Sequence, residues 1–157
     1  MAFEGIIGAV EAARLNKQQN VETEHLMKAL LEQKDGLARK ILTKAGVDNS
    51  SALQATDQFI SQQPKIVGDT GRLAMGDNLQ TLIDNAKRHQ KTMGDAFLSV
   101  EHFILAFHSD KRFGEQFFRN LGLGEKELKD AVLSVRGNQK VTDQKVLDFD
   151  QEDITGK

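Results

Sequence analysis

Apolar side chains recur along this chain at the spacing of helix faces, and the same pattern appears twice. A stripe at positions i, i+3, i+4 and i+7 near the N-terminus returns 73 residues later, counted from Ile6 to Leu79. The segment Glu-His-Leu-Met-Lys-Ala-Leu at 24–30 matches Glu-His-Phe-Ile-Leu-Ala-Phe at 101–107. Two further matches follow in the same order, 37–46 with 113–122 and 53–60 with 128–135. Four matches in one order indicate an internal duplication.

Each copy is predicted to form four helices. The expected ranges are 3–17, 23–33, 36–45 and 50–62 in the first copy, and 76–92, 99–108, 111–121 and 125–136 in the second. Polar residues suited to capping precede four of these helices: Asp35, Asn49 or Ser50, Ser99 and Asp110. Gly46 and Gly122 fall where a helix end favours a left-handed residue. No segment has the strict alternation of a half-buried strand. The sequence therefore predicts an all-α fold, in which two pseudo-symmetric four-helix repeats pack as one compact domain.

The duplication also predicts the domain boundaries. The helical domain is expected at 1–137, with repeat one at about 3–63, a connecting loop at 64–75 and repeat two at about 76–136. Residues 138–157 are polar and acidic, so we interpret them as a linker or tail.

Composition narrows the classes of function. Hydrophobic residues make up 39% and charged residues 28% of the chain, as in ordinary soluble globular proteins. The formal net charge is −2, which disfavours a nucleic-acid partner because phosphate binding requires a basic surplus. The absence of cysteine excludes disulfides and thiolate metal sites. No apolar run approaches the roughly 20 residues of a membrane-spanning helix, so we expect a soluble protein that does not bind membranes.

Several segments resemble a known family, the Clp N-terminal repeat domain. The residues that carry the resemblance are the two Glu-His helices, at 21–31 and 99–107, and an Arg-Gly at 136–137 followed by Val-Thr-Asp-Gln at 141–144. This exit sequence is similar to that of ClpB-type AAA+ disaggregase chaperones, especially organellar and cyanobacterial members. The resemblance covers about 3–144. The first helix lacks the Phe/Thr stretch that usually precedes it in the family, and residues 145–157 depart from the family's next helical segment.

The resemblance implies a protein-binding module that is not itself an enzyme. No Gly-x-x-x-x-Gly-Lys-Ser/Thr phosphate loop occurs, so we expect no ATP hydrolysis and no cofactor in this chain. By resemblance, an apolar substrate-binding groove near the fifth helix involves Leu82, Ile83, Asn85, Ala86, Phe97 and His102, with Asp95 and Glu101 as acids linked to substrate handling. Glu24 is the corresponding acid of a secondary site. In the ClpC branch such acids meet phosphorylated arginine.

Each of these residues also has a structural interpretation. Glu24 and Glu101 lie near helix starts, where the macrodipole favours carboxylates. His25 and His102 can be half-buried residues that bond the adjoining loop and fix the helix start. A metal site is not expected, because the histidines lack ligand spacing and there is no cysteine. The basic run at 87–91 is interpreted as a solvated helix face.

Two functions follow from the resemblance. The first is capture of unfolded or aggregated polypeptides, with adaptor proteins as further partners, for AAA+ modules of a hexameric full-length protein. The second is a free-standing accessory protein that binds a Clp protease core or an adaptor. The expected location is a bacterial cytoplasm or an organelle, with the chloroplast preferred over the mitochondrion.

Overall fold

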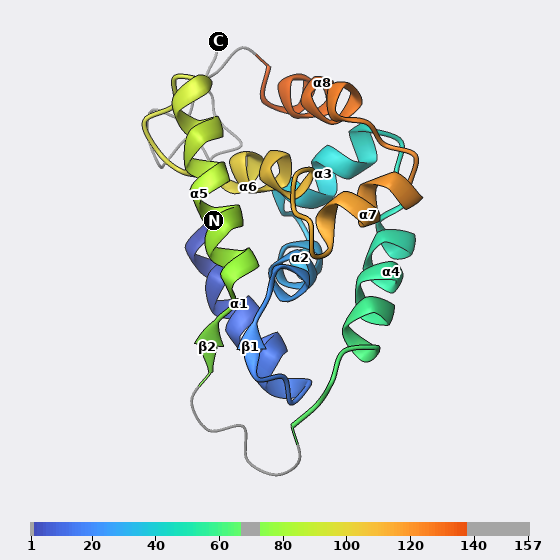
Figure 1. The fold of residues 1–157 in the computed structure, drawn as a ribbon. Coiled ribbons are helices and arrows are strands. Elements are labelled where there is room, and N and C mark those ends of the chain that lie inside the picture. The colour runs from blue at the N-terminus through green and yellow to red at the C-terminus, as the bar shows by residue number, and fades with distance from the viewer. Residues whose placement is uncertain (1, 67–72, 138–157) are drawn as a thin grey trace.

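The computed structural model describes residues 2–66 and 73–137, and this part of the chain is almost wholly helical (Figure 1). The helices of the first repeat are α1 (Ala2–Leu15), α2 (Thr23–Glu32), α3 (Leu37–Lys44) and α4 (Asn49–Ser61). Those of the second are α5 (Asp77–Thr92), α6 (Val100–Phe107), α7 (Gly114–Asn120) and α8 (Glu125–Arg136). The all-α prediction is confirmed. The expected tail at 138–157 lies outside the described residues.

Most helix ends follow local chemistry that the sequence indicated. Gly46 and Gly122 adopt φ values of 88° and 71°, as expected for left-handed residues that end α3 and α7. The N-cap of α7 is Phe113 rather than the predicted Asp110, although the Asp110 carboxylate accepts hydrogen bonds from the backbone N–H groups of Phe113 and Gly114, at 3.1 and 2.8 Å.

Two further predicted caps are wrong. The N-cap of α4 is Asp48, whose carboxylate accepts from the Ser51 N–H at 3.1 Å, and Asn49 is already helical. The N-cap of α3 is Gly36, which has no side chain, so Asp35 does not cap that helix. The cap of α3 lies one residue after the expected position, and the cap of α4 lies one residue before Asn49 and two before Ser50.

One apolar core joins the two repeats. Within each repeat the first two helices pack together, α1 on α2 and α5 on α6. Across the repeats α3 packs on α8 and on α6, and α2 packs on α5. The largest fully buried side chains come from both halves and include Leu26, Ile41, Leu82, Phe107 and Phe118. Neither repeat therefore encloses a core by itself.

A short parallel bridge, which the sequence analysis did not predict, also links the repeats. Strand β1 (Asn20–Val21) pairs with β2 (Ala74–Met75), with Asn20 opposite Ala74 and Val21 opposite Met75. Two residues are too few to show an alternating pattern, so this pairing cannot be read from hydrophobic periodicity. The bridge holds the end of α1 beside the start of α5 (Figure 1).

No helix of the described residues is both long and apolar enough to cross a membrane.

Candidate functional site

The start of α6 is built around a buried histidine. The His102 Nδ1 accepts a hydrogen bond from the backbone N–H of the N-cap residue Ser99, at 2.9 Å. A ring nitrogen thus takes the role that Glu or Gln plays at this position in a capping box. Since Nδ1 is the acceptor, the ring proton of neutral His102 must lie on Nε2. The expected role in fixing the helix start is confirmed, although the side chain is fully rather than half buried.

The Nε2 of His102 points at a buried ion pair. It lies 2.7 Å from Oδ2 of Asp95, and the same carboxylate binds the Arg136 guanidinium through two contacts of 2.6 and 3.0 Å. The side chains of His102 and Asp95 are 0% exposed and that of Arg136 is 7% exposed. A bidentate arginine supplies the charge compensation that a buried carboxylate requires.

Glu101 shares the same arginine. Its Oε2 lies 3.7 Å from Nε of Arg136, and its Oε1 accepts a hydrogen bond from the Ser99 hydroxyl. One guanidinium at the end of α8 therefore compensates two carboxylates, which come from the α5–α6 loop and from the first turn of α6. Asp95 and Glu101 are brought together as the sequence predicted, but they lie in the interior rather than on the surface.

The α5–α6 loop is fixed from a third side. The side-chain amide of Gln90, on α5, donates to the carbonyls of Asp95 and Ala96 at 3.2 and 3.1 Å. Beside these anchored residues, Phe97 leaves 43% of its surface exposed. The polar cluster thus holds a rigid loop that presents an aromatic ring.

The remaining residues of the predicted groove divide into two groups. Leu82 and Ala86 are 1% and 0% exposed, because they face the core between α5 and α6. Ile83 and Asn85 are partly exposed on α5, and with Phe97 they form the accessible part of the predicted set. We refer to Ile83, Asn85 and Phe97 as the α5–loop surface.

The first repeat has a related cluster around Glu24. Both carboxylate oxygens of Glu24 bind Arg112, each at 2.9 Å, and the Glu24 side chain is 0% exposed. Arg112 also donates to the Gln63 side chain at 3.3 Å and lies 3.7 Å from Glu22. The hydrogen bond to Glu24 is the main reason why the pKa of Arg112 is raised. A cationic ligand could reach Glu24 only by displacing Arg112.

His25 opens α2 as His102 opens α6. Its Nδ1 accepts from the backbone N–H of the N-cap Glu22 at 2.8 Å. Its buried Nε2, by contrast, has no hydrogen-bond partner among the described residues. Burial lowers the pKa of His25, since the charged ring would lose its hydration. Burial also raises the pKa of Glu22.

Sequence reasoning missed the two arginines that organise these clusters. Arg112 and Arg136 lie 88 and 41 residues from the acids that they bind, and no local pattern connects them. Matching the two repeats to each other could not have predicted the role of Arg112 either, because Arg112 belongs to the second repeat and binds Glu24 of the first. Within residues 2–66 and 73–137, no group of three or more His, Asp or Glu side chains is arranged to hold a metal ion.

Comparison with known proteins agrees with this architecture. The family model "Clp repeat (R) N-terminal domain" matches residues 1–121. The chain is 62% identical over 144 residues to the mitochondrial chaperone protein ClpB3 of Oryza sativa subsp. japonica, covering 92% of this chain and 15% of that protein. It is 51% identical over 144 residues to the chloroplastic ClpB3 of Arabidopsis thaliana, again covering 92% and 15%. The chain thus spans 15% of the length of these curated relatives.

Among solved structures, the fold is similar to the N-terminal domain of Hsp104 from Candida albicans. The TM-score is 0.79 at 15% sequence identity, covering 90% of this chain and 92% of that one. At this low sequence identity, the similarity shows a shared fold and nothing about function. The family model, the duplicated helices and the shared fold together show that the chain belongs to the family of Clp repeat N-terminal domains, where it is similar to the domains of ClpB chaperones.

Proposed function

We propose that this domain captures unfolded or aggregated polypeptides for a ClpB-like, ATP-dependent disaggregase. Its AAA+ modules would form the hexameric ring that threads the captured chain. The high identity to ClpB chaperones across almost the whole chain is the observation that carries this proposal. Adaptor proteins are proposed as further partners of the same domain.

The α5–loop surface is the proposed contact with clients. Unfolded chains share exposed apolar side chains, and a binding site for them needs apolar groups with a polar rim. Phe97 supplies an exposed ring, Ile83 adds partly exposed apolar surface, and Asn85 supplies a polar edge. Because the loop is already fixed by Gln90 and Arg136, little conformational entropy is lost when a client binds.

Asp95 and Glu101 act, in this proposal, as positioning residues rather than as contacts. Their carboxylates are buried and bound to Arg136, so a client does not meet them on the surface. Their removal would take away the two carboxylates that Arg136 binds here and would release the loop that carries Phe97.

The proposal is tested by removing the exposed ring while leaving the buried cluster intact. Phe97→Ala should weaken binding of reduced, carboxymethylated α-lactalbumin, a permanently unfolded client, by about tenfold, since burying part of a Phe side chain contributes about 1–2 kcal/mol. Binding is measured by fluorescence anisotropy, and heteronuclear NMR locates the shifted residues.

Leu15→Ala is the matched control. Leu15 is 82% exposed at the end of α1, which lies near the start of α5 and therefore a helix length away from the α5–α6 loop. Equal binding by the wild type, Phe97→Ala and Leu15→Ala would contradict a client site on the α5–loop surface. Shifts on α5 and α6 that disappear only in Phe97→Ala would support it.

The relatives do not favour the accessory alternative, since each of the two named above is a ClpB chaperone. They also bear on location, which we propose to be an organelle or a bacterium. The preference for the chloroplast has no support, because the mitochondrial relative is 62% identical and the chloroplastic one 51%.

A further inference from the structure

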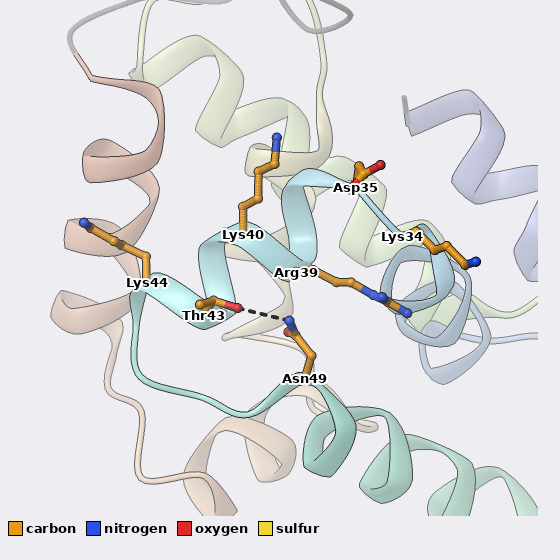
Figure 2. A pocket seen from close by; sticks show the side chains of 7 residues that line it. All are labelled: Lys34, Asp35, Arg39, Lys40, Thr43, Lys44 and Asn49. Atoms are coloured by element: carbon orange, nitrogen blue, oxygen red, sulfur yellow. Dashed lines mark hydrogen bonds between the residues drawn. The ribbon is translucent and has the colours of Figure 1, made fainter. Parts of the chain in front are cut away.

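A basic pocket lies on the first repeat, away from the α5–α6 loop. Its volume is about 550 Å³, and it is lined by the end of the α2–α3 connection, by α3 and by the first residue of α4 (Figure 2). Four of its lining side chains are cations: Lys34, Arg39, Lys40 and Lys44. Asp35 is the single carboxylate in the lining, so the formal charge of the pocket is four minus one, or +3. The whole chain, by contrast, carries −2.

These four cations are not neutralised within the described part of the protein. Some basic side chains elsewhere do pair with acids, as Lys28 does with Asp57 at 2.5 Å and Lys126 with Asp130 at 3.0 Å. No ion pair of this kind forms at Lys34, Arg39, Lys40 or Lys44 among residues 2–66 and 73–137. The pocket therefore carries a local excess of positive charge, which an anionic ligand would compensate.

The arrangement of the cations indicates the shape of the ligand. Figure 2 shows the lysine side chains at 34, 40 and 44 extending in different directions rather than converging on one point. The Arg39 side chain extends toward α2, where its Nε donates a hydrogen bond of 2.5 Å to the carbonyl of Leu31. A compact anion such as phosphate could satisfy one or two of these charges. An elongated ligand with several carboxylates can reach all of them.

The residues that line the pocket favour a polypeptide ligand over a nucleic acid. Its uncharged members are Thr43 and Asn49, joined by a hydrogen bond of 3.0 Å from Asn49 Nδ2 to Thr43 Oγ1. It contains no aromatic ring, so it lacks the platform on which single-stranded nucleic acids stack their bases. Amide and hydroxyl groups are instead suited to hydrogen bonds with a polypeptide backbone.

We propose that this pocket binds an acidic, Asp- and Glu-bearing segment of a partner polypeptide. Lys34, Lys40 and Lys44 contact successive carboxylates, and Arg39 binds one of them through its remaining N–H groups. The site is separate from the α5–loop surface and does not depend on client capture there. The partner is recognised by its negative charge, and not by the exposed apolar side chains of an unfolded polypeptide.

The probe is a fluorescein-labelled peptide of alternating Glu and Gly, about ten residues long, so that extended carboxylates span the pocket. The double variant Lys40→Glu, Lys44→Glu reverses two exposed charges on α3 and so changes the charge of the pocket by four units. It should weaken peptide binding by about tenfold or more, because each exposed ion pair contributes a few tenths of a kcal/mol to about 1 kcal/mol. The matched control is Lys87→Glu with Arg88→Glu, which changes the net charge equally on the exposed face of α5. Anisotropy is measured at fixed, low salt.

The pocket variant should lose binding while the control variant changes it by less than about twofold. A peptide with Gln in place of Glu should not compete. Equal weakening in the two variants would show nonspecific attraction and overturn the proposal. A single-stranded oligonucleotide that displaces the acidic peptide from the same residues would overturn it as well. Circular dichroism of both variants establishes that they are folded.

Discussion

The starts of α2 and α6 are the same device with different surroundings. In both, a buried histidine accepts the N-cap backbone N–H through Nδ1, at 2.8 Å for His25 and 2.9 Å for His102. The other ring nitrogen differs: Nε2 of His102 lies 2.7 Å from Asp95, whereas Nε2 of His25 has no partner among the described residues. The helix cap was retained in both repeats, while the groups behind the ring diverged.

The arginines show what that divergence achieves. Arg136 belongs to the same repeat as Asp95 and Glu101, so the second cluster fixes its own α5–α6 loop. Arg112 belongs to the second repeat but binds Glu24 of the first, so the first cluster joins the two halves. Glu101 therefore helps to fix the α5–α6 loop, whereas its counterpart Glu24 helps to hold the two repeats together.

The largest expected effect comes from breaking the second cluster. Arg136→Ala removes the cation that the buried carboxylates of Asp95 and Glu101 share, and should lower the free energy of unfolding by about 3–5 kcal/mol. Chemical denaturation followed by circular dichroism measures the loss. Arg136→Lys, which keeps the charge but not the bidentate geometry, should fall between the wild type and the alanine variant.

Breaking the first cluster should have a smaller effect. Arg112→Ala removes two charged hydrogen bonds to Glu24, but the Arg112 side chain is 25% exposed, so water can reach part of the space that it leaves. We expect a loss of about 1.5–3 kcal/mol in the same denaturation experiment. A loss larger than that of Arg136→Ala would reverse the ranking and contradict the comparison.

The burial of His25 predicts that the stability of the domain depends on pH. Burial holds the pKa of folded His25 below its ordinary value of 6.5, so at pH values between the folded pKa and 6.5 the unfolded chain binds a proton that the folded domain does not. Stability should therefore fall as the pH drops from neutral through that window. His25→Gln keeps an acceptor for the N-cap and should flatten the curve of unfolding free energy against pH. An unchanged slope in this variant would assign the effect to other groups.

The smallest effect concerns the last helix of each repeat. Asp48 caps α4 through its carboxylate, whereas the N-cap of α8 is Gly124, which has no side chain to do so. Asp48→Ala should lower stability by about 1 kcal/mol, measured by the shift of the denaturation midpoint. Asp48→Gly, which makes the two helix starts alike, should recover most of that loss.

The sequence was sufficient for the parts of the fold that depend on local pattern. The duplication and the helical spacing predicted all the helices described here, and α8 was predicted at its observed bounds, 125–136. The third helix of the second repeat was predicted from 111 but begins at Gly114. There the Asp110 carboxylate binds the first N–H groups, and Gly114 lies so close to the Phe107 carbonyl that a Cβ would meet its oxygen at 2.0 Å.

The candidate site was only partly accessible to sequence reasoning. The acids Asp95 and Glu101 and the ring of His102 do lie together, but the sequence could not show that Arg136 neutralises them in the interior. Nor could it show the basic pocket, because Lys34 and Asn49 are brought to the same pocket only by the turns on either side of α3. Charges distant in sequence are brought together by packing, and no periodicity encodes that packing.

The Arg112–Glu24 pair has a consequence for folding. In a solenoid each repeat contacts its neighbours through one face, so repeats can unfold one after another. Here an arginine of the second repeat closes the polar centre of the first, and α3 takes its apolar partner from α8. Loss of either half would leave the other with an uncompensated buried charge and an open core. The domain should accordingly unfold in a single cooperative transition, and the duplicated sequence corresponds to one folding unit instead of two.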